Sequence, residues 1–171
     1  LCQARQNVNA PVRLFIEGRL ANANAANNYT PNMATNGYVS VVLGNTTTDN
    51  GAAVSLALAR AVKYPAHVKL GSGQNGALSA TNIYLGTNKI ENVASLETLH
   101  DAGFLTFYKR TGIAGYFFGR DNMCSSDDFG TLVRGRIIDK AQRIATLAAT
   151  SYIEDYVRID ERYFRPTEVD M

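Results

Sequence analysis

Residues 114–157 read AGYFFGRDNMCSSDDFGTLVRGRIIDKAQRIATLAATSYIEDYV, and this stretch decides the fold. It predicts a short apolar strand, a polar turn and then one long helix. Serine and aspartate side chains at 125–128 offer oxygens that cap the free N–H groups of a helix, and the carboxylates suit the positive end of its dipole. The helix is therefore expected to begin near Asp127 or Asp128.

This long helix is expected to bury one face against the rest of the domain. Its apolar residues recur at steps of three and four, which is the pattern of an amphipathic helix. The stripe consists of Phe129, Leu132, Val133, Ile137, Ala141, Ile144, Ala145, Ala148 and Tyr152. The polar side chains lie mostly off the stripe and are expected at or near solvent: Arg134, Arg136, Asp139, Lys140, Gln142 and Arg143. The helix is thus predicted to be a scaffold element that carries no catalytic constellation.

Upstream, the sequence predicts alternating helices and strands. Helices are expected at 1–8, 52–62 and 93–103, strands at 12–18, 37–45, 66–71, 104–110 and 115–119, and a long surface loop at 21–36. The helix at 52–62 is so rich in alanine and leucine that most of its faces are expected to be buried, with Asp49 as its cap. The helix at 93–103 is expected to be capped by Ser95 and stopped by Gly103.

The order of these elements predicts an α/β fold. A strand, a helix and a strand across 37–71 indicate a βαβ unit with parallel pairing, whereas the glycine-containing turn before 115–119 favours an antiparallel hairpin. We therefore expect a layered domain with a mixed, partly parallel sheet of about five strands, flanked by helices and followed by a long C-terminal helix.

The length of 171 residues suits one domain of ordinary size. Residues 1–154 are predicted to form the α/β core. Residues 155–171 alternate charged and aromatic side chains, which is typical of an exit linker or arm. Because the opening residues resemble the last turns of a helix, the chain is expected to be a piece of a longer protein.

Composition argues for a globular chain and against two classes of partner. Apolar residues make up 46% and charged residues 19% of the sequence, which excludes wholesale disorder. The net charge of +2 is spread over scattered side chains, so no electrostatic argument favours nucleic acid or an anionic membrane. No apolar run approaches the roughly 20 residues that a membrane-spanning helix needs. Cys2 and Cys124 have no partner at metal-ligand spacing and are expected to be free thiols.

One motif points to a different function. Gly71, Gly73 and Gly76 fit the pattern GxGxxG, in which glycines let a pyrophosphate approach the N-terminus of a helix. The residues that follow show no helical stripe, and no acidic residue is placed to hold a ribose. An ordinary glycine-rich loop is therefore the main interpretation, and a small-ligand or nucleotide-binding α/β domain that uses this loop is the alternative.

No other motif indicates catalysis, a cofactor or a metal. His67 and His100 are the only histidines, and neither has a second ligand at helical or hairpin spacing. Asp127 and Asp128 are adjacent and suit helix capping better than a catalytic carboxylate pair. The sequence contains no GxSxG, HExxH, CxxC or Walker A motif. The motif search therefore identifies no catalytic residues.

Residues 102–145, AGFLTFYKRTGIAGYFFGRDNMCSSDDFGTLVRGRIIDKAQRIA, resemble a segment of contractile phage tail sheath proteins. In that segment a strand pair leads through a Ser/Asp turn into a long helix with an Arg-x-Ile-Asp-Lys-Ala core, which here is residues 136–141. Upstream, VRLFIEGR and the blocks from GAAVSLALARAV to VKLGSGQNGAL are similar to the same proteins in order and spacing. The resemblance is to the divergent sheath-like proteins of phages and prophages in gut anaerobes.

The resemblance implies a structural subunit of a contractile phage tail, or of a phage-derived injection system, and a protein that is not an enzyme. Such subunits assemble as stacked hexameric rings around an inner tube. The implied partners are other copies of the chain and the tail tube protein, with no nucleic acid, membrane or cofactor. The implied location is the virion tail, after synthesis and assembly in the bacterial cytoplasm. Sheath proteins have a further C-terminal domain, toward which residues 155–171 are expected to lead.

Two groups of charged residues are the candidate contacts between subunits. One is the charged face of the long helix, and the other is the segment that leaves the domain. They are Arg134, Arg136, Asp139, Lys140 and Arg143, and then Asp155, Arg158, Asp160, Glu161 and Arg162.

Overall fold

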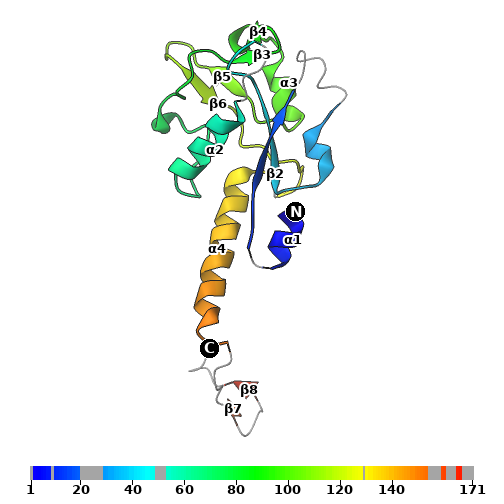
Figure 1. Ribbon diagram of the computed structural model, residues 1–171, viewed down its shortest axis with the longest axis vertical. Coiled ribbons are helices and arrows are strands. Elements are labelled where there is room, and N and C mark those ends of the chain that lie inside the picture. Colours follow the sequence, from blue (N-terminus) through cyan, green and yellow to red (C-terminus); the bar gives the residue numbers. More distant parts are fainter. Residues whose placement is uncertain are drawn as a thin grey trace.

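The computed structural model describes residues 2–8, 10–19, 29–48, 53–128 and 130–153, and the backbone of two short strands at 159–160 and 165–166. Helices and strands are mixed in one body, and helix α4 (Leu132–Thr150) extends away from it (Figure 1). The predicted α/β class and the long C-terminal helix are therefore confirmed. The other helices are α1 (Cys2–Asn7), α2 (Val54–Lys63) and α3 (Leu96–Asp101), with short 3-10 turns η2 (Pro31–Ala34), η3 (Gly73–Asn75) and η4 (Ile90–Asn92).

Among the described residues the strands form four pairs rather than one sheet of about five strands, so this expectation was wrong. β1 (Leu14–Gly18) runs parallel to β2 (Val39–Leu43), and β5 (Phe107–Lys109) runs antiparallel to β6 (Tyr116–Phe118). The two remaining pairs are β3 (Tyr84–Leu85) with β4 (Asn88–Lys89), and β7 (Ile159–Asp160) with β8 (Arg165–Pro166). A parallel bridge between Val42 and Leu105 links β2 to the chain just before β5.

The strand expected at 66–71 does not form, which removes the predicted βαβ unit. The amide of Val68 donates to the Pro65 carbonyl, and the amide of Ser72 donates to the Lys69 carbonyl, so this stretch is bent into turns. The amide of Leu70 donates to the Asp121 carboxylate instead of to a neighbouring strand. Parallel pairing is present, but between β1 and β2.

Helix α4 begins at Leu132 after Thr131, four residues later than the Ser/Asp cluster predicts. The cluster belongs to a closed loop whose two ends are hydrogen-bonded to each other. The amide of Met123 donates to the Gly130 carbonyl at 3.0 Å, and the amide of Leu132 donates to the Asp121 carbonyl at 2.9 Å. These bonds fix the chain in a turn at 127–128, where the sequence predicts a helix start. Phe129 lies outside the described residues.

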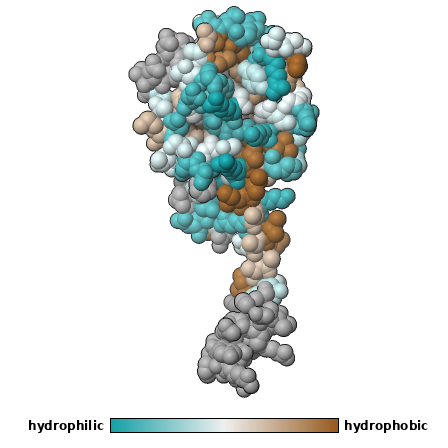
Figure 2. Space-filling view, turned by 180° about the vertical axis from the view of Figure 1, so that it is seen from behind, coloured by the Kyte–Doolittle hydropathy of each residue, from teal (hydrophilic) through white to brown (hydrophobic). Residues whose placement is uncertain are grey.

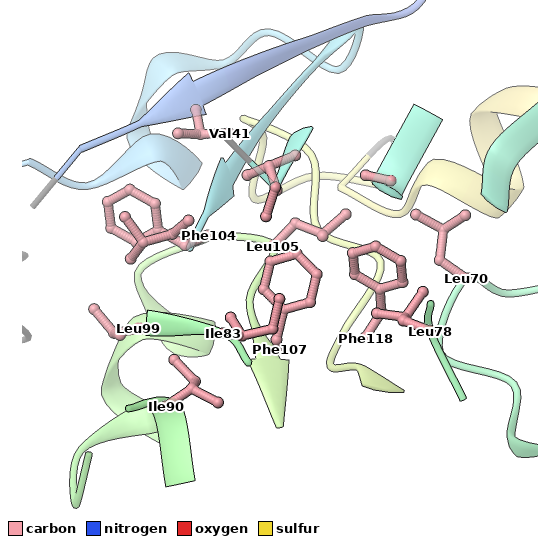
Figure 3. Packing of buried hydrophobic residues seen from close by; sticks show 14 of the residues in the cluster. Val41, Leu70, Leu78, Ile83, Ile90, Leu99, Phe104, Leu105, Phe107 and Phe118 are labelled. Carbon is pink, nitrogen blue, oxygen red and sulfur yellow. The ribbon is translucent and has the colours of Figure 1, made fainter. Parts of the chain in front are cut away.

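The core lies beneath β2 and around the β5–β6 hairpin (Figure 3). The rings of Phe107 and Phe118 pack at a centroid distance of 4.7 Å, and both side chains are almost fully buried. Phe104, Leu105 and Ile83 close the cluster. Burial of this many large apolar side chains supplies the main favourable term for folding.

Several local predictions are confirmed. α1, β1, β2, α3 and the hairpin occur where the sequence places them. Gly103 ends α3 with a φ of +95°, a conformation that favours glycine. Ser95 occupies the N-cap position of that helix, but its side chain makes no capping hydrogen bond, so its predicted capping role is not confirmed. Asp49, the expected cap of α2, lies outside the described residues, as do residues 21–28 of the expected loop. Cys2 and Cys124 are free and buried.

Candidate functional site

The first half of α4 is fastened to the body by a buried ion pair. The Nε and Nη2 atoms of Arg13, just before β1, donate to the two carboxylate oxygens of Asp139 at 2.6 and 2.8 Å. Arg13 also donates to the Gly37 carbonyl, and its guanidinium lies against Gly135, where a side chain would collide with it. The Asp139 side chain is 3% exposed and the Arg13 side chain 10%.

This pair overturns the expected position of Asp139, which the sequence places at or near solvent. The helix is rotated so that Leu132, Gly135 and Asp139 face the body. Sequence reasoning missed Arg13 because nothing in the pattern of 10–19 marks a partner more than a hundred residues away. The proposed part of Asp139 in subunit contacts stays a prediction, although its carboxylate already has a partner within the chain.

Arg136 joins α4 to the end of α2. Its Nη2 atom donates to the carbonyls of Ala61 at 2.6 Å and Tyr64 at 2.8 Å. Burial lowers the pKa of the guanidinium, and the carboxylate of Asp121 acts in the opposite direction. Arg136 therefore has a fold contact, in addition to its predicted place among the subunit contacts.

Replacing Arg136 by leucine is expected to lower the free energy of unfolding by about 1.5–3 kcal/mol, because two carbonyls at the end of α2 lose a charged donor. Urea unfolding measures this loss. The control is Arg143→Leu, since Arg143 is exposed on the same helix, and its replacement should change stability by less than about 0.5 kcal/mol. Equal effects of the two substitutions would contradict the role assigned to Arg136.

Within the described residues, no ion pair joins the second half of α4 to the body. Gln6 of α1 donates to Gln142 at 2.7 Å, and residues 143–153 are all exposed. Residues 144–153 contain no charged side chain, and hydrophobic surface runs from the body onto this projecting part (Figure 2). Its large exposed side chains are Ile144, Leu147, Tyr152 and Ile153.

The predicted buried stripe is therefore wrong for most of its length. Of its residues, Leu132 is buried, but Ile137 is 45%, Ile144 is 58% and Tyr152 is 60% exposed. The apolar residues do recur at helical spacing, but after Leu132 the described part of the chain leaves their side chains partly or largely exposed. Exposed and uncharged surface such as that of residues 144–153 is typical of an interaction site.

The remaining candidate contact residues divide into exposed and undescribed ones. Lys140 and Arg143 are exposed on α4, as predicted, and Arg134 lies 3.4 Å from Asp128 at the surface. Asp160 lies in β7, opposite Arg165 of β8. The other predicted contacts in the exit segment lie outside the described residues: Asp155, Arg158, Glu161 and Arg162.

A groove lies between α2, β1 and the first half of α4. Its volume is about 460 Å³. Apolar side chains of β1, α2 and the turn after α2 line it, and basic side chains of α4 stand along it: Phe15, Leu58, Val62, Ala66, Lys140 and Arg143. Leu58 is 53% and Val62 is 78% exposed, so the expectation that most faces of α2 are buried was wrong. We call this site the α2–α4 groove.

The glycine-rich loop borders a second, larger cavity of about 730 Å³. Gly71 packs directly against the carbonyls of Phe118 and Gly119, where a side chain would not fit. The loop continues into the 3-10 turn η3, and no α-helix begins directly after Gly76, so the arrangement differs from a dinucleotide-binding turn.

Titratable groups near this cavity serve the fold. Asp121 is buried, which raises the pKa of its carboxyl, and the amides of Leu70 and Gly71 partly offset this effect. Burial lowers the pKa of the His100 imidazole, which lies within hydrogen-bond distance of the Thr106 hydroxyl. His67 lines the cavity with an exposed side chain.

Within the described residues, no group of three histidine, cysteine, aspartate or glutamate side chains is placed to hold a metal ion. The helices described there include none with the length and apolarity to cross a membrane. Comparison with models of known protein families and with curated protein sequences finds no match to this chain.

Proposed function

We propose that this chain is a structural subunit of a contractile phage tail sheath, or of a phage-derived injection system, and that it carries out no catalysis. Its work is self-association into stacked hexameric rings around an inner tube, with the tail tube protein as the second partner. It would be made and assembled in the bacterial cytoplasm and would end in the virion tail.

One observation carries the proposal: ten successive residues, 144–153, are exposed and uncharged at the end of a helix that leaves the body. Exposed apolar surface of this kind marks an interaction site. The resemblance of residues 102–145 to sheath proteins supplies the kind of partner. Identical subunits that meet through two different surfaces form rings or helical filaments, which is the architecture that a sheath requires.

Electron microscopy of negatively stained full-length protein at high concentration tests this function. We expect tubes or stacked rings with six-fold end views. Discrete monomers or dimers at every salt concentration would contradict the proposal.

The alternative is a small-ligand or nucleotide-binding domain that uses residues 71–76, and the observation in its favour is the cavity of about 730 Å³ beside this loop. A ligand that binds only the folded state raises the melting temperature. Thermal unfolding with ADP and with NAD therefore separates the two functions. A sheath subunit should melt at the same temperature with and without either nucleotide.

A further inference from the structure

We propose that residues 144–153 at the end of α4 dock into the α2–α4 groove of a second copy of this chain, in a head-to-tail contact. The inference rests on the proposed function only in taking the partner to be another copy. It names the two surfaces that meet, and the contacts of the described residues cover neither the apolar side chains of the groove nor those of 144–153.

The groove side presents apolar groups that a folded chain normally covers. Leu58 and Val62 lie one turn apart on α2, and both are more than half exposed. Phe15 and Ala66 lie beside them in the lining of the groove. An apolar segment placed here would remove all four side chains from water, which is favourable in proportion to the area covered.

The docking side offers side chains of matching chemistry. Ile144, Leu147, Tyr152 and Ile153 are between 58% and 76% exposed. No charge interrupts this segment, so it can be buried without the cost of desolvating an ion. Residues 144–150 are helical, which reduces the conformational entropy lost on binding.

Charge complementarity favours a second copy of this chain as the occupant of the groove. Lys140 and Arg143 stand along the groove, and both are exposed. In the sequence, Glu154 and Asp155 follow directly after the uncharged segment. The groove is also lined by Arg136 and by the Arg13–Asp139 ion pair, so basic side chains outnumber its single carboxylate. A copy that inserts residues 144–153 has two acidic residues next to the docked segment, and opposite charges favour this orientation over its reverse.

A head-to-tail contact is favoured over a two-fold pairing of α4 helices. Two paired α4 helices would cover each other and leave Leu58 and Val62 in water. A contact between the end of α4 and the groove covers both surfaces of every copy with one kind of interface. Such heterologous contacts propagate into rings or filaments.

The interface is small, so it should be weak between isolated copies. Contacts of this size fall at the low end of specific interfaces, and their strength in an assembly comes from repetition. Trapping by disulfide formation at high protein concentration therefore suits the test. Cys2 and Cys124 are buried and can stay in place.

The experiment uses two single variants, Val62→Cys and Leu147→Cys, each in the full chain. Mixing them under mild oxidation should give a disulfide-linked product of two chains that neither variant gives alone. Efficient self-linking of Leu147→Cys alone would mean that α4 helices pair with each other, and it would overturn the proposal. Absence of the mixed product would overturn it as well.

A second measurement does not depend on cysteines. Leu147→Glu and Val62→Glu should each weaken self-association at least tenfold in sedimentation experiments, while the melting temperature of the monomer stays the same. The matched control is Met33→Glu in η2, since Met33 is 79% exposed and lies in neither surface. An equal loss in this control would contradict the proposed contact.

The outcomes separate this inference from the proposed function. If Leu147→Glu still formed rings, this result would contradict the docking contact but not the sheath function. A specific mixed disulfide without rings or tubes would support the contact and remove the sheath function.

Discussion

Replacing Asp139 by alanine is expected to lower the free energy of unfolding by about 3–5 kcal/mol, because it leaves the Arg13 guanidinium buried without its carboxylate. Both N–H groups that donate to Asp139 would lose their acceptor at once. The side chain of Arg13 is only 10% exposed, so water cannot replace the lost partner in full. Urea unfolding, with the linear extrapolation to water, measures the loss.

Two controls show whether the loss comes from burial. Asp128→Ala removes the exposed partner of Arg134 and should change stability by less than about 1 kcal/mol. The double variant Arg13→Met/Asp139→Leu removes both charges and should recover much of the loss. If Asp139→Ala cost no more than Asp128→Ala, the ion pair would not be what holds α4 to the body.

Local sequence signals predicted the elements that depend on near neighbours. β1 and β2 follow from runs of branched apolar residues, and Gly103 ends α3 where a left-handed residue is required. The start of α4 could not be predicted in this way. Serine and aspartate at 125–128 suit a helix cap and a closed loop equally well. The backbone hydrogen bond from the Leu132 amide to the Asp121 carbonyl closes the loop, and the helix therefore begins after it.

The candidate site was predictable in its pattern but not in its placement. The apolar stripe of α4 was visible in the sequence, but periodicity does not tell whether the chain itself or another molecule covers it. Leu132 at its start meets the body, and Ile144 and Tyr152 do not. The groove residues Leu58 and Val62 were missed because an alanine-rich helix looks buried on all sides. The absence of charge from 144 to 153 was the signal that set this segment apart from the rest of the helix.

Truncating Phe107 to alanine is expected to lower the free energy of unfolding by about 3–5 kcal/mol, because it removes a fully buried ring and leaves a cavity that its neighbours fill only in part. The ring packs against Phe118 at 4.7 Å, and Gly44 has no room for a side chain beside it. The end of β2, beside Gly44, and the β5–β6 hairpin therefore lose their common packing centre. Chemical denaturation followed by tyrosine fluorescence or circular dichroism measures the change.

The matched comparison is Tyr152→Ala, which removes an aromatic ring of similar size from the exposed end of α4. Tyr152 is 60% exposed, so its loss should change the free energy of unfolding by less than about 0.5 kcal/mol. A large loss at Tyr152 would mean that the end of α4 packs on its own body, and it would remove the surface on which the docking contact depends. A small loss at Tyr152 together with a large one at Phe107 separates the two kinds of apolar residue in this chain: one stabilises the fold, and the other is free to bind a second copy.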